Sequence, residues 1–245
     1  MGYGKPEMMA AAIIREIKAG DVVFHGLASS TIMVAMKAAK ALGIEYTYVT
    51  LSDGVDHDWK RPPYVASTLT ENTYTGSVAT FGLDEIFDLF ASGKGDIAFL
   101  SCLQMDKEGR IAMSYLGGDY DHPKLRGPGG AGSATLTPIT PRTTIWKPQH
   151  DKKTFVEHVD FATTMPALDK EFTLITPLCI FRKPIGEKYL KLDCIFPYTT
   201  IEEVKENTGW AIDETEVPVM DAPTEAELAA LKQVDPNNIL AFEFK

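Results

Sequence analysis

The chain has 245 residues and a formal net charge of −10 at neutral pH. This length predicts one large domain over residues 1–245. The acidic pI near 5.0 argues against nucleic-acid binding as the main role. No apolar run approaches the roughly 18 residues needed to cross a membrane. The N-terminus lacks the basic and apolar segments of a signal peptide.

The first half of the sequence alternates predicted helices and strands. An amphipathic helix begins at Pro6 and ends before Gly20, and a second runs from the segment around Ser29 to Leu42. Apolar, strand-like segments cover residues 21–25, 45–51 and 96–100, and a third helix covers residues 82–91. This βαβ pattern predicts an α/β fold of the open kind, with a mostly parallel sheet flanked by helices.

The second half is predicted to contain more hairpins. Residues 104–111 read as one hairpin, and two strands between residues 174 and 196 form another around Pro184. A glycine-rich turn at residues 127–133 is followed by a β-type segment, with a strand at 143–146. Short helices follow Thr200 and Thr224, and Glu227 completes a capping box with Thr224.

The cysteines and histidines do not indicate a metal or redox site. Cys102, Cys179 and Cys194 are far apart and form no CxxC pair, so we expect buried, reduced thiols in a cytoplasmic protein. His57 and His122 lie among aspartates, but side chains at adjacent positions rarely point the same way. We therefore predict no metal site.

The glycine-rich turn is the strongest candidate binding feature. Glycine lets backbone adopt positive φ and approach a ligand closely, and successive N–H groups can form a nest for an oxyanion or phosphate. The turn is neither a Walker A loop nor a dinucleotide fingerprint. The alternative is a flexible surface loop. The candidate residues are Gly127, Gly129, Gly130, Ala131 and Gly132.

Basic residues surround this turn although the chain as a whole is acidic. Local positive charge beside a glycine-rich backbone favours a large anionic ligand. His150 has an equally good alternative as a polar residue at a helix start. The candidate ligand-binding residues are Lys124, Arg126, Gln149, His150 and Lys152.

A second candidate region follows the strand at residues 45–51. Thr50, Ser52 and Asp53 lie at its carboxyl end, and Gly54 follows. In open α/β sheets, ligands bind and catalytic groups are placed at that end of the strands. Ser52 or Asp53 could react there; the alternative is an ordinary Asp-Gly turn.

Several segments together resemble the β subunit of family I CoA-transferases of the glutaconate CoA-transferase type. They are residues 118–124 (GDYDHPK), 127–132 (GPGGAG), 148–156 (PQHDKKTFV) and 159–163 (VDFAT), with Asn207-Thr208-Gly209 and Val234-Asp235-Pro236. The resemblance implies a CoA-transferase fold, a homologous α subunit as partner and an active site between subunits. It implies a coenzyme A thioester as substrate and no permanently bound cofactor. The glycine-rich loop would face the thioester and stabilise its oxyanion.

One departure from the family concerns the nucleophile. These transferases attack the acyl-CoA with a glutamate at the end of the second strand. An ungapped comparison puts Thr50 at that position, and a small shift puts Asp53 before the glycine. A threonine cannot form the acyl anhydride, whereas an aspartate can, although it is one methylene shorter.

This departure resembles the β-like subunit of the ring-opening hydrolases of steroid degradation. That subunit carries a Thr-Asp-Gly turn, and the α subunit supplies the key carboxylate. The sequence therefore leaves open CoA transfer between acids, CoA-thioester-dependent C–C hydrolysis, and a non-catalytic ligand-binding module. The acidic charge and the lack of a DNA-binding segment disfavour the last.

Overall fold

The computed structural model describes residues 2–244. Their contacts group the chain into two compact units. Unit 1 comprises Met1–Phe99 and Ala222–Lys245, and unit 2 comprises Leu100–Asp221. The single domain that the sequence predicts stays a prediction, and each unit is described below by itself.

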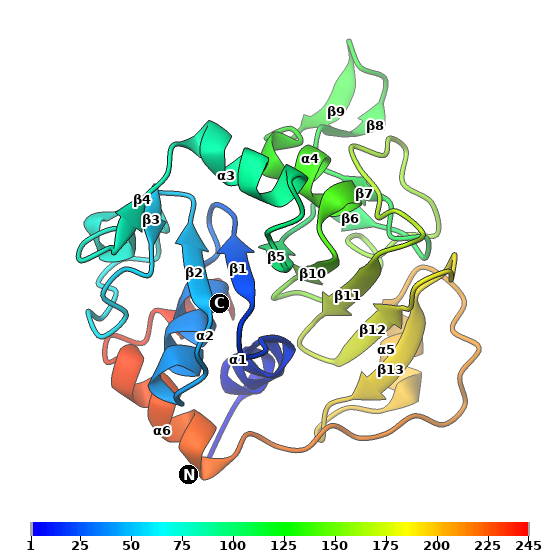
Figure 1. Ribbon diagram of the computed structural model, residues 1–245. Coiled ribbons are helices and arrows are strands. Elements are labelled where there is room, and N and C mark those ends of the chain that lie inside the picture. The colour runs from blue at the N-terminus through cyan, green and yellow to red at the C-terminus, as the bar shows by residue number, and fades with distance from the viewer. Residues whose placement is uncertain (1, 245) are drawn as a thin grey trace. The chain divides into compact units, whose positions relative to one another are not determined.

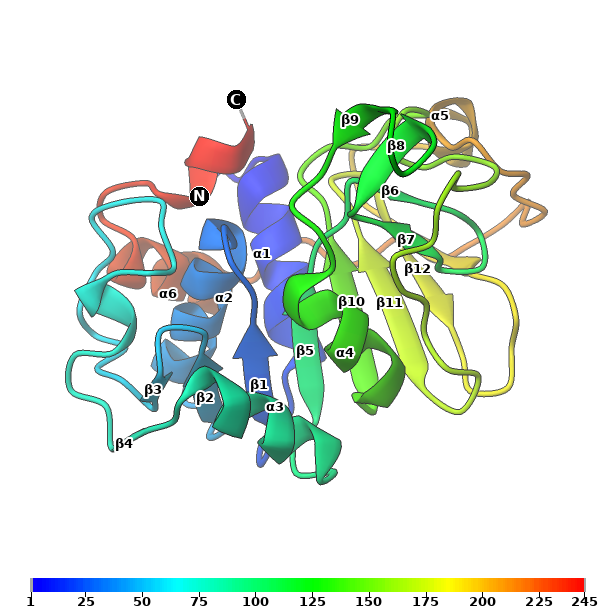
Figure 2. The ribbon, with the colours of Figure 1, turned by 90° about the horizontal axis from the view of Figure 1, so that it is seen from above.

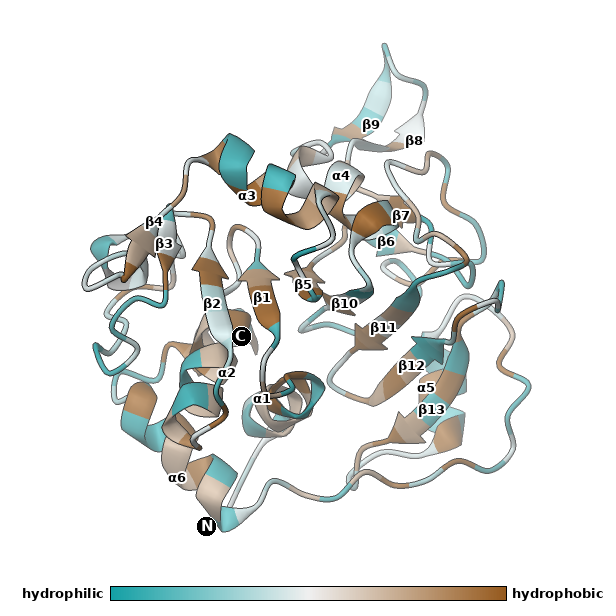
Figure 3. Cartoon of the chain, viewed as in Figure 1, coloured by the Kyte–Doolittle hydropathy of each residue, from teal (hydrophilic) through white to brown (hydrophobic). Residues whose placement is uncertain are grey.

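Unit 1 is built on three parallel strands with β1 (Val22–His25) in the middle. It pairs with β2 (Thr47–Thr50) on one side and β5 (Ile97–Leu100) on the other. Two short antiparallel strands continue beyond β2, β3 (Gly54–Val55) and β4 (Ala79–Thr80). Figure 3 shows β1 as largely hydrophobic, as expected of a strand that is covered on both faces.

Helices enclose these strands. Helix α2 packs against both α1 and α6, and α3 lies on the other side of the strands (Figures 1 and 2). The predicted capping box is present, because Thr224 accepts a hydrogen bond from the Glu227 N–H and Glu227 accepts one from the Thr224 N–H. Arg15 pairs with Glu227 at 2.8 Å and so joins α1 to α6. The helices are α1 (Lys5–Glu16), α2 (Ser30–Ala41), α3 (Leu83–Ala91), α6 (Glu225–Val234), and the 3₁₀ turns η1 (Glu71–Thr73) and η2 (Leu240–Phe244).

Unit 2 has its own group of four strands. Strand β10 (Arg142–Trp146) is parallel to β11 (Glu171–Ile175). Strands β12 (Cys179–Lys183) and β13 (Lys191–Ile195) then follow antiparallel. Two small hairpins are separate from these strands, and one of them projects from the unit (Figure 1). The remaining elements are β6 (Gln104–Met105), β7 (Ile111–Ala112), β8 (Tyr115–Gly118), β9 (Pro123–Arg126), α4 (Ala131–Ile139) and α5 (Ile201–Asn207).

The predicted α/β class is confirmed, because in each unit parallel strands are continued on one side by antiparallel strands. Two elements differ from the prediction. The end of the glycine-rich turn begins helix α4, because Ala131, Gly132 and Ser133 form its first turn. The predicted hairpin around Pro184 is present as β12 and β13. Leu174 and Ile175, however, end the separate strand β11, because a turn follows in which the Thr176 hydroxyl accepts hydrogen bonds from two N–H groups.

The three cysteines are buried and free, as the sequence predicts. Burial raises the pKa of the Cys102 thiol to about 11 and raises that of Cys179 as well. Both thiols are therefore protonated and unreactive at neutral pH. Within residues 2–244, no helix is long and apolar enough to span a bilayer.

Candidate functional site

The first group of candidate residues forms the turn after β2 in unit 1. Thr50 is fully buried, Ser52 is half-buried and Asp53 is exposed. Asp53 has a φ of 68°, and a Cβ at Gly54 would lie 2.4 Å from the Thr73 carbonyl oxygen. Position 54 therefore has to be glycine, because a side chain there would collide with the Thr73 carbonyl oxygen. The turn leaves the Asp53 carboxylate in solvent, with no hydrogen-bond partner in the described part of the chain.

The Thr50 hydroxyl is engaged within this turn. Its Oγ1 lies 3.1 Å from the Gly54 carbonyl and 3.0 Å from the Thr73 carbonyl, and it accepts a hydrogen bond from the Gly54 N–H at 3.0 Å. The Ser52 hydroxyl lies 2.5 Å from the Thr73 hydroxyl. Thr50, which an ungapped comparison aligns with the expected glutamate, thus stabilises the turn with a hydroxyl that is already engaged.

A buried histidine cluster lies next to this turn, and sequence reasoning missed it. His25 is the register partner of Thr50 on the neighbouring strand. Its Nδ1 lies 2.9 Å from the Ser29 hydroxyl, and its Nε2 lies 3.0 Å from the Tyr48 hydroxyl. The Tyr48 ring packs edge-on against His57, with 4.6 Å between centroids. The only signal in the sequence was a histidine at the end of an apolar strand.

Burial keeps the two histidines of this cluster in their neutral forms. It lowers the pKa of His25 to about 4 and that of His57 to about 3. It also lowers the pKa of Lys37, a fully buried residue of α2, to about 8. The Lys37 Nζ donates to the Arg61 carbonyl at 3.1 Å. The two histidines are therefore uncharged at neutral pH, and Lys37 and Lys40 are charged groups near them.

The glycine-rich loop in unit 2 has the backbone of an anion nest. Gly130 is in the right-handed region at φ −67° and ψ −35°, and Ala131 follows at φ 41°. This alternation turns successive N–H groups toward one point. Gly127 and Gly129 donate their N–H groups inward, to the Ser114 and Met113 carbonyls at 2.9 and 3.0 Å.

The N–H groups of the next three loop residues remain open. No acceptor within residues 2–244 pairs with those of Gly130, Ala131 and Gly132. They also begin α4, whose N-terminus favours negative charge. A non-glycine residue at positive φ is uncommon and costs about 1–3 kcal/mol. The loop thus holds three open N–H donors on a strained, preformed backbone.

Lys124 and Arg126 lie on β9, in the hairpin that projects from unit 2. Two residues apart on a strand, they share one face. Arg126 is paired with Tyr115, whose ring stacks on that of Phe161 at 4.9 Å. Arg126 also lies over the Tyr120 ring and donates to the Tyr120 carbonyl. One face of the hairpin therefore combines two cations with aromatic rings.

Gln149, His150 and Lys152 lie in the loop after β10. Gln149 and Lys152 are exposed. His150 is half-buried, with Nδ1 2.8 Å from the Thr176 hydroxyl and Nε2 3.0 Å from the Thr208 hydroxyl. Burial lowers its pKa to about 4. No helix starts at His150, so its helix-start alternative is wrong.

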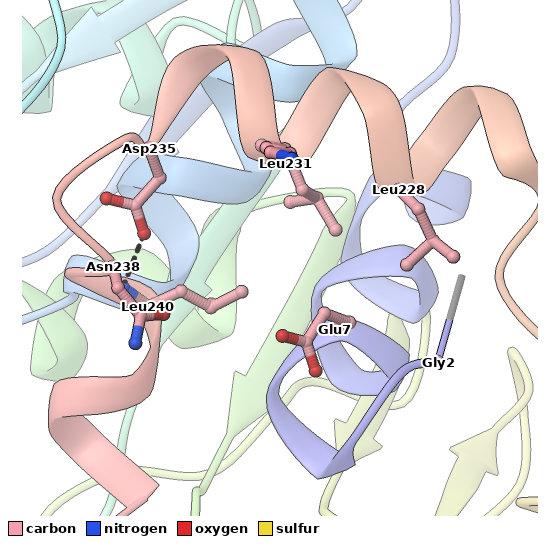
Figure 4. A pocket seen from close by; sticks show the side chains of 8 residues that line it. Gly2, Glu7, Leu228, Leu231, Asp235, Asn238 and Leu240 are labelled. Atoms are coloured by element: carbon pink, nitrogen blue, oxygen red, sulfur yellow. Dashed lines mark hydrogen bonds between the residues drawn. The ribbon is translucent and has the colours of Figure 1, made fainter.

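A pocket in unit 1 lies between α6 and the N-terminal end of α1 (Figure 4). It has a volume of about 280 Å³, and none of the candidate residues lines it. Its carboxylates already have partners: Glu7 accepts from the Gly4 N–H, and Asp235 accepts from two N–H groups. Within residues 2–244, no group of three or more His, Cys, Asp or Glu side chains could hold a metal.

The family is decided by comparison with known proteins. A protein-family model described as coenzyme A transferase matches residues 6–207 of the sequence. This chain belongs to the coenzyme A transferase family. The family that the sequence motifs suggested is thereby confirmed.

Named relatives in the family cover almost the whole chain. The chain is 30% identical to the B subunit of 3-oxoadipate CoA-transferase from Pseudomonas knackmussii, over 98% of this chain and 96% of that protein. It is 25% identical to the B subunit of glutaconate CoA-transferase from Acidaminococcus fermentans, over 96% and 93%. A solved structure of the decarboxylase AibA/AibB matches with a TM-score of 0.91 at 27% identity and covers 100% of both chains.

Proposed function

We propose that the chain is the β-type subunit of a heteromeric enzyme that transfers coenzyme A between carboxylic acids. A homologous α-type subunit would complete the active site, and an acyl-CoA thioester would be the substrate. Two family relatives that are themselves B subunits of CoA-transferases, matched over at least 96% of this chain, support this proposal. Three buried free thiols fit a reducing cytoplasm.

The observation that carries the proposal is the nest in the glycine-rich loop. When a nucleophile attacks a thioester, negative charge develops on the carbonyl oxygen. Preorganised N–H donors stabilise that charge without reorganisation and typically contribute about 100-fold or more in rate. The open N–H groups of Gly130, Ala131 and Gly132 supply such donors, and the inward bonds of Gly127 and Gly129 hold them in place.

The basic hairpin would bind the nucleotide part of coenzyme A. Lys124 and Arg126 can pair with its phosphates, and the Tyr115–Phe161 stack offers a ring face for adenine. Gln149 and Lys152 would add polar contacts after β10. His150, with both ring nitrogens engaged, would contribute by holding that loop in shape.

Asp53 is our candidate for the reacting carboxylate. Its oxygen would attack the thioester carbonyl carbon, break the C–S bond and release the CoA thiolate, leaving an acyl-aspartyl anhydride. The thiolate would then attack the aspartyl carbonyl and release the first acid. The resulting aspartyl-CoA thioester would pass its CoA to the second acid by the reverse steps. Ser52, beside it, would orient the turn through Thr73.

A second candidate function needs no covalent carboxylate in this chain. It is favoured by Thr50, which an ungapped comparison aligns with the glutamate and which is buried with its hydroxyl engaged. In this alternative the α-type subunit supplies the carboxylate. The product would come from decarboxylation, as the name of the AibA/AibB relative states for that protein, or from hydrolysis of a C–C bond.

The deciding experiment uses the chain co-expressed with an α-type subunit. The complex is incubated with acyl-CoA and treated with borohydride, and the reduced residue is mapped by mass spectrometry. We expect the label on Asp53. We also expect Asp53→Asn to lower kcat for CoA transfer at least about 100-fold, with Asp169→Asn as an exposed control. The chain without its partner should be inactive.

Full transfer activity in Asp53→Asn would contradict the covalent role of Asp53. No label, together with release of CO₂ or water-dependent cleavage, would favour the second candidate. Transfer by the isolated chain would contradict the need for an α-type subunit.

A further inference from the structure

The segment Val159-Asp160-Phe161-Ala162-Thr163 makes hydrogen bonds to which the proposed function assigns no role. The Thr163 Oγ1 accepts from the N–H of Met113 at 2.9 Å and from the N–H of Ser114 at 3.0 Å. It also lies 2.9 Å from the Ser114 hydroxyl. A hydroxyl oxygen has two lone pairs and one proton. Because the two N–H groups use the lone pairs, the Thr163 proton goes to Ser114 Oγ.

The two residues that Thr163 holds also hold the glycine-rich loop. The Ser114 carbonyl accepts the Gly127 N–H at 2.9 Å, and the Met113 carbonyl accepts the Gly129 N–H at 3.0 Å. Thr163 therefore holds the N–H groups of Met113 and Ser114, and the carbonyl groups of the same two residues anchor the loop. All of these residues belong to unit 2.

Thr163 also contacts the loop directly. Its methyl carbon Cγ2 lies 3.1 Å from the place that a Cβ on Gly130 would occupy. The side chain thus packs beside the first residue of the nest. A nearby carboxylate makes a similar backbone contact, since Asp160 Oδ2 accepts the Gly117 N–H at 2.9 Å.

We propose that Thr163 is a positioning residue for the anion nest. It holds the Met113–Ser114 step, and through it the Gly127 and Gly129 anchors, so that the N–H groups of Gly130, Ala131 and Gly132 converge on one oxygen. This inference rests on the proposed function of the loop. Catalysis is sensitive to errors of about 1 Å in the positions of such donors. We call the hydrogen bonds between Thr163 and the backbone of Met113 and Ser114 the clamp. The clamp should therefore affect the chemical step more than substrate binding.

The test compares two substitutions of Thr163 with one at its neighbour. Thr163→Val keeps the shape but removes the acceptor, whereas Thr163→Ser keeps the hydroxyl. Thr164→Val is the matched control, because Thr164 is buried beside it but its hydroxyl makes no hydrogen bond with the described residues. Amide hydrogen exchange is measured on the isolated chain, and kcat and KM are measured on the complex with the α-type subunit.

For Thr163→Val we expect the Gly127 and Gly129 amides to exchange at least about 10-fold faster. We expect kcat to fall by about 10- to 100-fold, with KM changed less than about 3-fold. Thr163→Ser and Thr164→Val should stay close to the wild type in both measurements. Rescue by serine separates the hydrogen bonds from general loss of packing.

Unchanged amide exchange in Thr163→Val would overturn the clamp, whatever the enzyme does. An equal loss in Thr164→Val, or no rescue by Thr163→Ser, would also overturn it, because packing would then explain the effect. If the wild-type complex transfers no CoA, the proposed function fails while the exchange measurement still decides the clamp.

Discussion

At the residue scale, Thr50 and Asp53 divide the work of one short turn. The Thr50 hydroxyl is buried and holds the backbone of Gly54 and Thr73. Asp53, three residues later, is exposed at positive φ, and its carboxylate has no hydrogen-bond partner within residues 2–244. A side chain that is already satisfied stabilises the fold, and one that is left unpaired is available to a substrate.

Replacing Thr50 tests the structural half of this division. Thr50→Val removes the acceptor of the buried Gly54 N–H, and such a loss costs about 1–3 kcal/mol. We expect the free energy of unfolding in urea to fall by that amount. Thr47→Val, in the same strand but half-exposed, should change it by less than about 0.5 kcal/mol. Equal effects at both positions would show that the turn does not depend on the hydroxyl.

At the scale of elements, a loop anchored by its own backbone presents the nest. Gly127 passes so close to Met113 that a Cβ would lie 2.1 Å from the Met113 carbonyl oxygen. The loop then enters α4 at Ala131 without a side-chain cap. The first N–H groups of a helix lack intrahelical partners. The same geometry therefore leaves donors unpaired and turns them toward a possible anion.

The close approach at Gly127 leads to a prediction for the loop. Gly127→Ala should force the loop away from Met113 and lower the free energy of unfolding by about 1–3 kcal/mol. Gly93→Ala is the control: it is strained by its φ of 75° but meets no atom within 4 Å, so we expect a loss near 1 kcal/mol. Thermal unfolding of both variants measures the difference. A smaller loss for Gly127→Ala than for Gly93→Ala would contradict the close approach.

At the scale of the whole molecule, three histidines are kept neutral by burial. The folded pKa is about 4 for His25 and His150 and about 3 for His57, against about 6.5 in an unfolded chain. Between these values the unfolded chain binds more protons. Stability is therefore fully present above pH 6.5 and is lost as the pH falls toward 4.

The size of this loss can be measured by urea unfolding between pH 7.5 and pH 5. Each buried histidine should lower the free energy of unfolding by on the order of 2 kcal/mol at pH 5. His57→Leu should make the loss of unfolding free energy between pH 7.5 and pH 5 smaller by the share of one histidine. No other interaction should be lost with it, because the His57 ring nitrogens have no hydrogen-bond partner in the part of the chain that the structure describes. His122→Leu, at an exposed position, is the control for the substitution itself. A flat profile in the wild type would contradict the neutral burial.

The sequence by itself determined the α/β class, most elements and the family. Apolar strands alternating with capped helices are local patterns, and residues such as Thr224 and Glu227 form their capping box within one turn. Four segments of motif, read together, were enough for the coenzyme A transferase family. The glycines at positions 54 and 127 are visible in the sequence, but the close backbone contacts that require them are seen only in the structure.

The tertiary structure alone decided what each candidate side chain can do. Thr50 and His150 looked as available as Asp53 in the sequence, and only packing showed their polar atoms to be engaged. The contacts of Thr163 with Met113 and Ser114 join residues 49 to 50 positions apart. The strand-like threonines after the glycine turn also became part of α4. Hydrogen bonds between distant segments carry no local pattern, so the fold has to form before such roles can be read.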